Sequence, residues 1–263
     1  SWDFLSVKGL LVHSPKLLLA WNEGHVRDAI THHDMPQGRI KIAGASVFDD
    51  WFGLKPSLSL EKFCEANGLD KQRPIVTYLG SSHVAVRDES WLVEKLRKAL
   101  DAFSDSHAQK AQLIVRPHPM NYRIYKKFSM PCVFILPKGG ALPDTKESFQ
   151  LFYDTLYYST AVFGVSTSAF IESMIMDKPV ISILAERYKK TQLEIQHFRD
   201  LSESGALELA HTEEEAAEIL KRIFDGDDQT KSARNAFVKS FVRPLGLDKP
   251  ASEAAAEEIE KLV

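Results

Sequence analysis

Short apolar runs rich in β-branched residues alternate with stretches of helical periodicity along most of this chain. The runs cover residues 16–21, 39–43, 74–79, 112–115, 132–136, 161–165 and 180–184. Residues 90–103 show the helical period best, because their apolar residues fall on one side of a helix and their charged residues on the other sides. Their apolar stripe consists of Leu92, Leu96, Leu100 and Phe103. Strands that alternate with amphipathic helices are typical of βαβ units. The sequence therefore predicts an α/β fold in which helices flank a parallel sheet.

Charge and composition exclude two classes of partner. The 263 residues carry a formal net charge of −3, so no overall positive field attracts nucleic acid, and we expect no nucleic-acid partner. No apolar stretch reaches the ~18–20 residues that a membrane span needs, and the N-terminus lacks the pattern of a signal peptide. Cys64 and Cys132 lack the spacing of a zinc site, which favours reduced thiols in a cytoplasmic protein.

The pattern of elements indicates a domain boundary near residue 55. Glycine and proline punctuate this region, at Gly53, Pro56, Gly68 and Pro74. Upstream lie only two predicted strands and one helix, too few for an independent α/β domain, and the chain begins without a methionine. We therefore expect a piece of a longer protein. Its parts would be the truncated end of an N-terminal domain (1–55), a main domain (56–250) and a final helix that can return to the N-terminal domain (251–263).

The first polar cluster follows the run LIVRPHP, residues 113–119. Arg116 and His118 come directly after a predicted strand, and the two prolines hold this segment extended. In open parallel sheets, ligands bind outside the carboxyl ends of the strands. An arginine adds a permanent charge there, and an imidazole can donate to a phosphate or act as acid or base near neutral pH. A purely structural histidine in a loop would look the same.

A second polar cluster lies in the run FGVSTSAFIE, residues 163–172. Ser166, Thr167 and Ser168 precede a predicted helix, and the amides and hydroxyls at a helix start can hold an anion such as a phosphate. Glu172 falls on the same side of the first turns as Ser168, so its carboxylate could accept hydrogen bonds from a ribose. The alternative is an ordinary N-cap followed by a solvated glutamate.

A third strand end carries Gly80, Ser81 and Ser82, which repeat the pattern of glycine followed by hydroxyls. These residues could line the same crevice, because the carboxyl ends of parallel strands share one edge of the sheet. A plain turn between a strand and a loop would have the same sequence.

Histidine and aspartate cluster at His32, His33 and Asp34. These types can ligate a metal, but here they stand at the expected end of the helix 24–33. Histidine complements the helix dipole there, and Asp34 begins a stop signal. The sequence therefore predicts no metal site and no cofactor.

At these residues the chain resembles the C-terminal half of a GT-B fold glycosyltransferase, a protein with two Rossmann-like domains. His118-Pro119 and Ser166-Thr167 match the His-Pro motif and the Ser/Thr pair of sialyl- and Kdo-transferases. The chain also resembles teichoic-acid type glycerophosphotransferases, and the similarity covers most of 73–224. Residues 165–181 resemble the donor-binding stretch of GT-B enzymes, with Glu172 at the ribose position.

Upstream motifs resemble the end of the N-terminal domain in CDP-glycerol transferase-like and epimerase-like proteins. These motifs are Ser1-Trp2-Asp3, Lys8-Gly9, Trp21-Asn22-Glu23 and Ala43-Gly44-Ala45. The acidic motif that supplies the general base in sialyltransferases is not recognisable here, and neither are the catalytic carboxylates of the epimerases. An isomerase therefore ranks below a transferase.

The resemblance implies an enzyme that moves a sugar or polyol-phosphate from a CMP-, CDP- or UDP-activated donor without a metal. The acceptor would be a glycan or lipid-linked precursor of a surface polysaccharide, and the enzyme cytoplasmic, with at most peripheral contact with the inner membrane face. His118 would be catalytic. The nucleotide site would comprise Gly80, Ser81, Ser82, Arg116, His118, Ser166, Thr167, Ser168 and Glu172. Two alternatives are a UDP-N-acetylglucosamine 2-epimerase-like isomerase and a nucleotide-binding module without catalysis.

Overall fold

Two units divide the chain in the computed structural model, which describes residues 2–103, 107–137, 139–140 and 142–262. Unit 1 combines the chain up to Gly53 with the chain from Asn235 onward, and unit 2 spans Leu54–Arg234. Among the described residues, none of the helices has the length and apolarity needed to span a bilayer.

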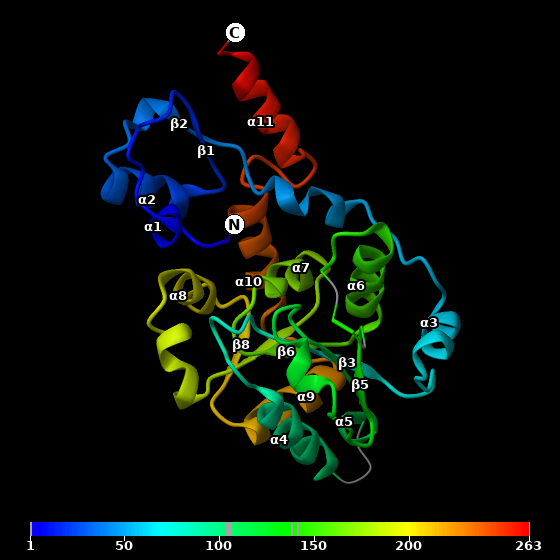
Figure 1. Cartoon of the computed structure of the whole chain (residues 1–263). Helices are drawn as coiled ribbons and strands as arrows, with labels where there is room; N and C mark the ends of the chain where they lie inside the picture. The colour runs from blue at the N-terminus through cyan, green and yellow to red at the C-terminus, as the bar shows by residue number, and fades with distance from the viewer. Residues whose placement is uncertain (1, 104–106, 138, 141, 263) are drawn as a thin grey trace. The chain divides into compact units, whose positions relative to one another are not determined.

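Unit 2 is built on a parallel sheet, which has six strands within the described residues, in the order β5-β4-β3-β6-β7-β8 (Figure 1). The strands are β3 (Ile75–Leu79), β4 (Gln112–Arg116), β5 (Val133–Ile135), β6 (Val162–Gly164), β7 (Val180–Ile183) and β8 (Glu208–Ala210). From β3 the chain builds outward to β5, then returns to the other side of β3 and continues to β8. The strand order therefore reverses between β3 and β6, and ligands of open α/β sheets bind at such a switch point.

Helices cover both faces of this sheet, because successive side chains of a strand point to opposite faces. Val76 and Tyr78 share one apolar core with residues of α4 (Ser90–Asp101) and α9 (Glu213–Phe224). Ile75 belongs to a second core on the other face, with residues of α3 (Leu60–Asn67) and α6 (Lys146–Tyr158). The parallel α/β fold expected from the alternating pattern is confirmed, and so is the amphipathic helix at 90–103.

The register brings the carboxyl ends of the central strands level. Leu79 pairs with Arg116 of β4 on one side and with Gly164 of β6 on the other. A Cβ atom added to Gly164 would lie 2.8 Å from the carbonyl oxygen of Leu79 and 2.9 Å from the ring of Phe170. Glycine at this position therefore lets α7 (Ala169–Ile175) begin directly against the end of β3.

The remaining elements of unit 2 are α5 (His107–Lys110), η3 (Tyr122–Tyr125), η4 (Glu186–Thr191) and α8 (Gln196–Glu203). Helix α10 (Lys231–Phe237) begins in this unit and runs past its border. The guanidinium of Arg234 is fully buried and pairs with Asp177 at 2.6 Å and with Asp228 at 2.8 Å. This paired charge holds the start of α10.

Unit 1 contains a parallel pair of strands packed with one helix. Its elements are α1 (Leu5–Lys8), β1 (Leu18–Ala20), α2 (Glu23–His33), η1 (Gln37–Arg39), β2 (Ile40–Ile42), η2 (Ser46–Phe52), η5 (Val238–Val242) and α11 (Ala251–Glu260). Asn22 caps α2 by accepting the backbone N–H of His25 at 3.2 Å. Of the upstream motif residues, Ser1 lies outside the described residues.

The C-terminal segment folds with the N-terminal one. Asp49 caps α11, because its carboxylate accepts the backbone N–H groups of Ala251 at 2.9 Å and Ser252 at 2.8 Å. Gly44 has φ +90°, and an added Cβ would lie 2.8 Å from the carbonyl oxygen of Val242. Residues 235–250 therefore belong to unit 1, whereas the domain range expected from the sequence ran to 250. No glycine or proline marks this border, since α10 runs across it without a break. The functional roles expected for the three ranges stay predictions.

Candidate functional site

A pocket of about 150 Å³ opens at the switch point of the sheet of unit 2. Side chains and backbone after β3, β4 and β6 form its wall. The sequence-predicted residues that line it are Gly80, Arg116, His118, Thr167, Ser168 and Glu172, and the other lining residues are Leu79, Pro117, Pro119, Leu142, Pro143, Phe152 and Ala169. The structure thus brings the polar residues of three strand ends into one cavity.

Gly80 lets the ends of β3 and β4 come together. Its backbone N–H donates to the carbonyl oxygen of Arg116 at 2.9 Å. A Cβ added to Gly80 would lie 2.9 Å from the backbone nitrogen of His118, closer than real Cβ contacts. The glycine is therefore required for the close approach of the loop that carries His118.

Arg116 places a shielded positive charge in the pocket wall. The residue is only 7% exposed, and its guanidinium lies 4.3 Å from the centroid of the Phe152 ring. Within the described part of the chain, its Nη1 atom has no hydrogen-bond partner. Burial lowers the pKa of Arg116 to about 10, although neighbouring Glu172 acts in the opposite direction. The group thus stays charged at neutral pH, and a buried charge with an unused N–H group indicates a place for an anion.

Glu172 lies in the first turn of α7 and is half-buried. Its Oε2 atom is shielded from solvent, and no described residue donates to it. Burial raises the pKa of Glu172 to about 8, although its own backbone N–H and Arg116 act in the opposite direction. At neutral pH the carboxyl is therefore mostly protonated. It can donate as well as accept a hydrogen bond, whereas the sequence pattern suggested a carboxylate acceptor.

His118 is half-buried at the end of β4. Its Nδ1 atom accepts the backbone N–H of Met120 at 3.2 Å, so the neutral ring carries its proton on Nε2. Burial lowers the pKa of His118, and neighbouring His83 adds to the lowering. The ring is therefore a neutral donor at neutral pH.

The hydroxyls of Thr167 and Ser168 lie where β6 turns into α7. The Oγ1 atom of Thr167 accepts the backbone N–H of Ala169 at 3.3 Å, so Thr167 provides a partner for one backbone N–H group at the start of α7. Ser168 is the N-cap residue by position, but it makes no side-chain capping hydrogen bond. An ordinary serine N-cap, the alternative for this sequence, therefore does not describe Ser168.

The other predicted hydroxyls do not line the pocket. Ser81 and Ser166 are buried behind its wall, where the backbone N–H of Ser166 donates to the Oγ atom of Ser81 at 3.4 Å. The Oγ atom of Ser82 accepts the backbone N–H of Ala85 at 3.4 Å, as in a plain turn. The sequence cannot separate these serines from Thr167 and Ser168, because all of them follow strands of one sheet.

Three residues near the pocket carry no signal in the sequence. Phe152 has the spacing of a core residue on α6, yet its ring also supports Arg116. Glu89 is fully buried and accepts the hydroxyl of Tyr78 at 3.0 Å. The side-chain amide of Asn121 donates to the carbonyl oxygen of Ser81 at 3.0 Å. Their partners lie outside their own helices, so no helical or strand periodicity reveals them.

His33 and Asp34 of the cluster at the end of α2 have structural roles. The ring of His33 accepts the backbone N–H of Leu11 at 3.2 Å, and Asp34 ends the helix with φ 51°. The described ranges contain no group of three or more His, Cys, Asp or Glu side chains placed to hold a metal ion.

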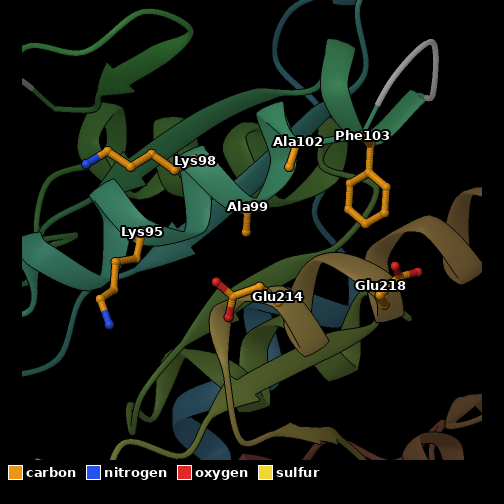
Figure 2. A pocket seen from close by; sticks show the side chains of 7 residues that line it. All are labelled: Lys95, Lys98, Ala99, Ala102, Phe103, Glu214 and Glu218. Carbon is orange, nitrogen blue, oxygen red and sulfur yellow. The ribbon is translucent and has the colours of Figure 1, made fainter.

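A larger hollow lies away from the strand ends, between α4 and α9 (Figure 2). Its volume is about 470 Å³, and Figure 2 shows lysines on the α4 wall and glutamates on the α9 wall. The lining residues are Lys95, Lys98, Ala99, Ala102, Phe103, Glu214 and Glu218. Lys95 is already engaged, since it lies 3.6 Å from Glu213 and over the ring of Trp91. This hollow between mixed charges contains no buried unsatisfied group, as far as the described side chains show.

No family model and no curated protein matches this chain in sequence. Solved structures match nearly all of it at low identity. Staphylococcus aureus MnaA with UDP has a TM-score of 0.64 and 13% identity, over 94% of this chain and 60% of that chain. The UDP-GlcNAc 2-epimerase of Methanocaldococcus jannaschii, with UDP-GlcNAc and UDP, has a TM-score of 0.60 and 14% identity, over 94% and 61%. The wall teichoic acid polymerase TagF soaked with CDPG has a TM-score of 0.57 and 13% identity, over 94% and 57%.

The chain thus spans about three fifths of the length of the structures it matches. At such identities the likeness establishes the fold. The parallel sheet flanked by helices agrees with these structures, and the sequence-based expectation of an α/β fold of the GT-B type is confirmed.

Proposed function

We propose that the pocket of unit 2 binds the nucleotide of an activated donor, and that the protein transfers the sugar or polyol-phosphate of this donor. The observation that carries the proposal is Arg116. Its guanidinium is buried against Phe152 at the switch point, and Nη1 has no partner among the described side chains. A charge in this situation costs stability unless a ligand uses it. A phosphate is the ligand that suits a planar guanidinium best.

The neighbouring residues suit the rest of a nucleotide. In the proposed complex, Arg116 and the Nε2–H of His118 donate to the phosphate, and the hydroxyls of Thr167 and Ser168 complete its surroundings. Glu172 holds the ribose. Donors fixed around the departing phosphate stabilise the charge that develops when the bond to the transferred group breaks. In this scheme His118 is the catalytic residue and needs no metal ion beside it.

The ligands named for the similar structures support a nucleotide as the ligand of this protein. They are UDP, UDP-GlcNAc and CDPG. We propose a glycan or lipid-linked precursor of a surface polysaccharide as the acceptor, as the sequence resemblance implies.

Nucleotide binding to the Arg116→Met variant tests the proposal. Methionine keeps the packing against Phe152 and removes the charge. We expect the wild-type protein to bind UDP or CDP, and the affinity of Arg116→Met to be about 10- to 150-fold lower, because charged hydrogen bonds contribute about 1.5–3 kcal/mol each. Its melting temperature should be unchanged or higher. Isothermal titration calorimetry with UDP, CDP and CMP measures the affinities.

The matched control is Arg123→Met, which removes an exposed arginine of the same unit and should bind like the wild type. His118→Ala should weaken binding less, by about 2- to 10-fold, because it removes a neutral donor. The proposal is wrong if the wild type binds none of the nucleotides, or if Arg116→Met binds them as tightly as the wild type.

An isomerase is the second candidate, because MnaA and the epimerase have higher TM-scores than TagF. Incubation with UDP-GlcNAc, followed by proton NMR, separates the two functions. The epimer at C2 would appear without an acceptor if the protein is an isomerase. A sugar transferase would release UDP, or CMP from a CMP-activated donor, in step with transfer, and a polyol-phosphate transferase would release CMP from its CDP-activated donor. A module without catalysis would bind and leave the nucleotide unchanged.

A further inference from the structure

A buried chain of hydrogen bonds runs behind the pocket wall in unit 2. The backbone N–H of Ser166 donates to the Oγ atom of Ser81 at 3.4 Å. The hydroxyl of Ser81 donates to Oε2 of Glu89 at 3.2 Å, and the backbone N–H of Ser81 donates to Oε1 at 2.5 Å. All three residues are buried. Because a backbone N–H can only donate, the direction of the chain is fixed from Ser166 through Ser81 to Glu89.

This chain connects the strand ends that form the pocket. Ser81 follows Gly80 at the end of β3, and Ser166 immediately precedes Thr167 and Ser168 after β6. The side-chain amide of Asn121 adds the loop after β4, since it donates to the carbonyl oxygen of Ser81 at 3.0 Å. The backbone N–H of Asn121 in turn donates to the carbonyl oxygen of His118 at 2.7 Å. The positions of all three pocket walls therefore depend on Ser81 and its partners.

We propose that Glu89 is a positioning residue for phosphate binding, which acts through Ser81 to hold the Thr167–Ser168 hydroxyls and His118 at the separation that a nucleotide phosphate needs. This inference rests on the proposed function. Glu89 does not line the pocket, and its hydrogen bonds to the residues that follow the strand ends go to Ser81.

The ionised form of Glu89 suits this role. Its carboxylate accepts three hydrogen bonds. The donors are the backbone N–H of Ser81, the hydroxyl of Ser81 and the hydroxyl of Tyr78. The other titratable groups that face it are Asp88, Tyr125 and Tyr188. Burial raises the pKa of Glu89 to about 7. Protonation turns one oxygen into a donor and removes one of these bonds, so the chain is intact above about pH 7 and weakened below it.

Two variants test the inference, with one matched control. Ser81→Ala cuts the link to Ser166 but keeps the backbone bond to Glu89. Glu89→Gln keeps the shape and imitates the protonated acid. The control, Ser159→Ala, removes another buried hydroxyl of unit 2, which bonds to Thr77 and Thr155 at 2.7 Å each. Calorimetry measures the affinity for UDP and CDP, and for uridine and cytidine as probes without a phosphate.

We expect Ser81→Ala to bind UDP or CDP about 3- to 10-fold more weakly, the effect of one lost hydrogen bond, and to bind the nucleosides as the wild type does. Ser159→Ala should bind all four probes normally. Glu89→Gln should bind the nucleotides more weakly than the wild type at pH 8 and equally at pH 5.5. A merely structural carboxyl would change the affinity by the same factor at both pH values.

The inference is overturned if Ser81→Ala matches Ser159→Ala, if the nucleosides are affected as strongly as the nucleotides, or if the Glu89→Gln effect is independent of pH. In those cases the proposed function still stands. Absence of nucleotide binding by the wild type would instead reject the proposed function and this inference with it. If Ser81→Ala fails to fold, Glu89→Gln alone decides.

Discussion

Glu89 and Glu172 both stand at the carboxyl edge of the same sheet, and burial raises the pKa of both, to about 7 and about 8. Their surroundings differ. Glu89 accepts hydrogen bonds from Ser81 and Tyr78, whereas no described residue donates to the shielded Oε2 of Glu172. The first glutamate completes the scaffold, and the second leaves a polar atom for a ligand. Between these two glutamates, unused hydrogen-bonding capacity separates the group in the pocket wall from the group behind it.

Two buried arginines of unit 2 repeat this contrast. Arg234 pairs with Asp177 and Asp228, whereas the Nη1 atom of Arg116 has no partner in the described ranges. Both arginines are buried, but only one is neutralised by the protein. A phosphate would give Arg116 the partner that Arg234 already has.

The largest expected effect comes from truncation of the two glutamates. Glu89→Ala leaves the donors of Ser81 and Tyr78 without a buried acceptor, and each unsatisfied donor costs about 1–3 kcal/mol. We expect a loss of about 3 kcal/mol in the free energy of unfolding at pH 7. Glu172→Ala removes a group that the fold leaves unsatisfied, so its stability should be unchanged or higher. Urea unfolding followed by circular dichroism measures both values.

Equal losses for the two variants would contradict the contrast between scaffold and binding wall. Ser159→Ala, which removes a satisfied hydroxyl, is the control for the general cost of a buried polar truncation in this unit.

The next effect is the pH dependence of stability. Because the folded pKa of Glu172 is about 8 and that of an unperturbed glutamate is 4.5, the folded state binds more protons than the unfolded state between these values. The free energy of unfolding should therefore fall as pH rises through this range, by up to about 1.4 kcal/mol per pH unit for each such group. Glu89 adds a similar decrease in the free energy of unfolding between pH 4.5 and about pH 7.

Glu172→Gln cannot titrate and should lose its share of this slope. We expect the stability of the wild type, relative to Glu172→Gln, to fall by about 2 kcal/mol between pH 5 and pH 6.5. Parallel curves for the two proteins would show that the carboxyl of Glu172 is ionised in the fold.

The smallest effect concerns the approach of the strand ends. Gly80→Ala places a methyl group 2.9 Å from the backbone nitrogen of His118. We expect a loss of about 1.5 kcal/mol, the usual size of a local overpacking effect, together with weaker UDP or CDP binding. Gly139→Ala is the control in the same unit, because its added Cβ meets nothing within 4 Å. A Gly80→Ala variant that is as stable and binds as tightly as Gly139→Ala would mean that the two loops have room to separate.

Much of the scaffold could be predicted from the sequence. The seven apolar runs correspond to β1–β7, and the apolar stripe in residues 90–103 corresponds to α4. Strand β8 was missed, because Glu208–Ala210 begins with a glutamate and contains no β-branched residue. The sequence allowed the final helix to return to the N-terminal segment, but it gave no signal that residues 235–250 join unit 1, because their partners, such as Asp49, lie about 200 positions earlier.

The sequence by itself determined that polar residues collect at one edge of a parallel sheet. Helical connections make successive strands parallel, so Arg116, His118, Thr167 and Glu172, which lie at or after the ends of such strands, lie at the same edge of the sheet. Only the tertiary structure decided which polar groups at this edge form hydrogen bonds within the protein and which remain available to a ligand. Ser81 meets Glu89 and Ser166, and Arg116 meets the ring of Phe152. A buried donor is satisfied only if packing brings an acceptor from another element close to it. A local sequence pattern cannot identify that acceptor.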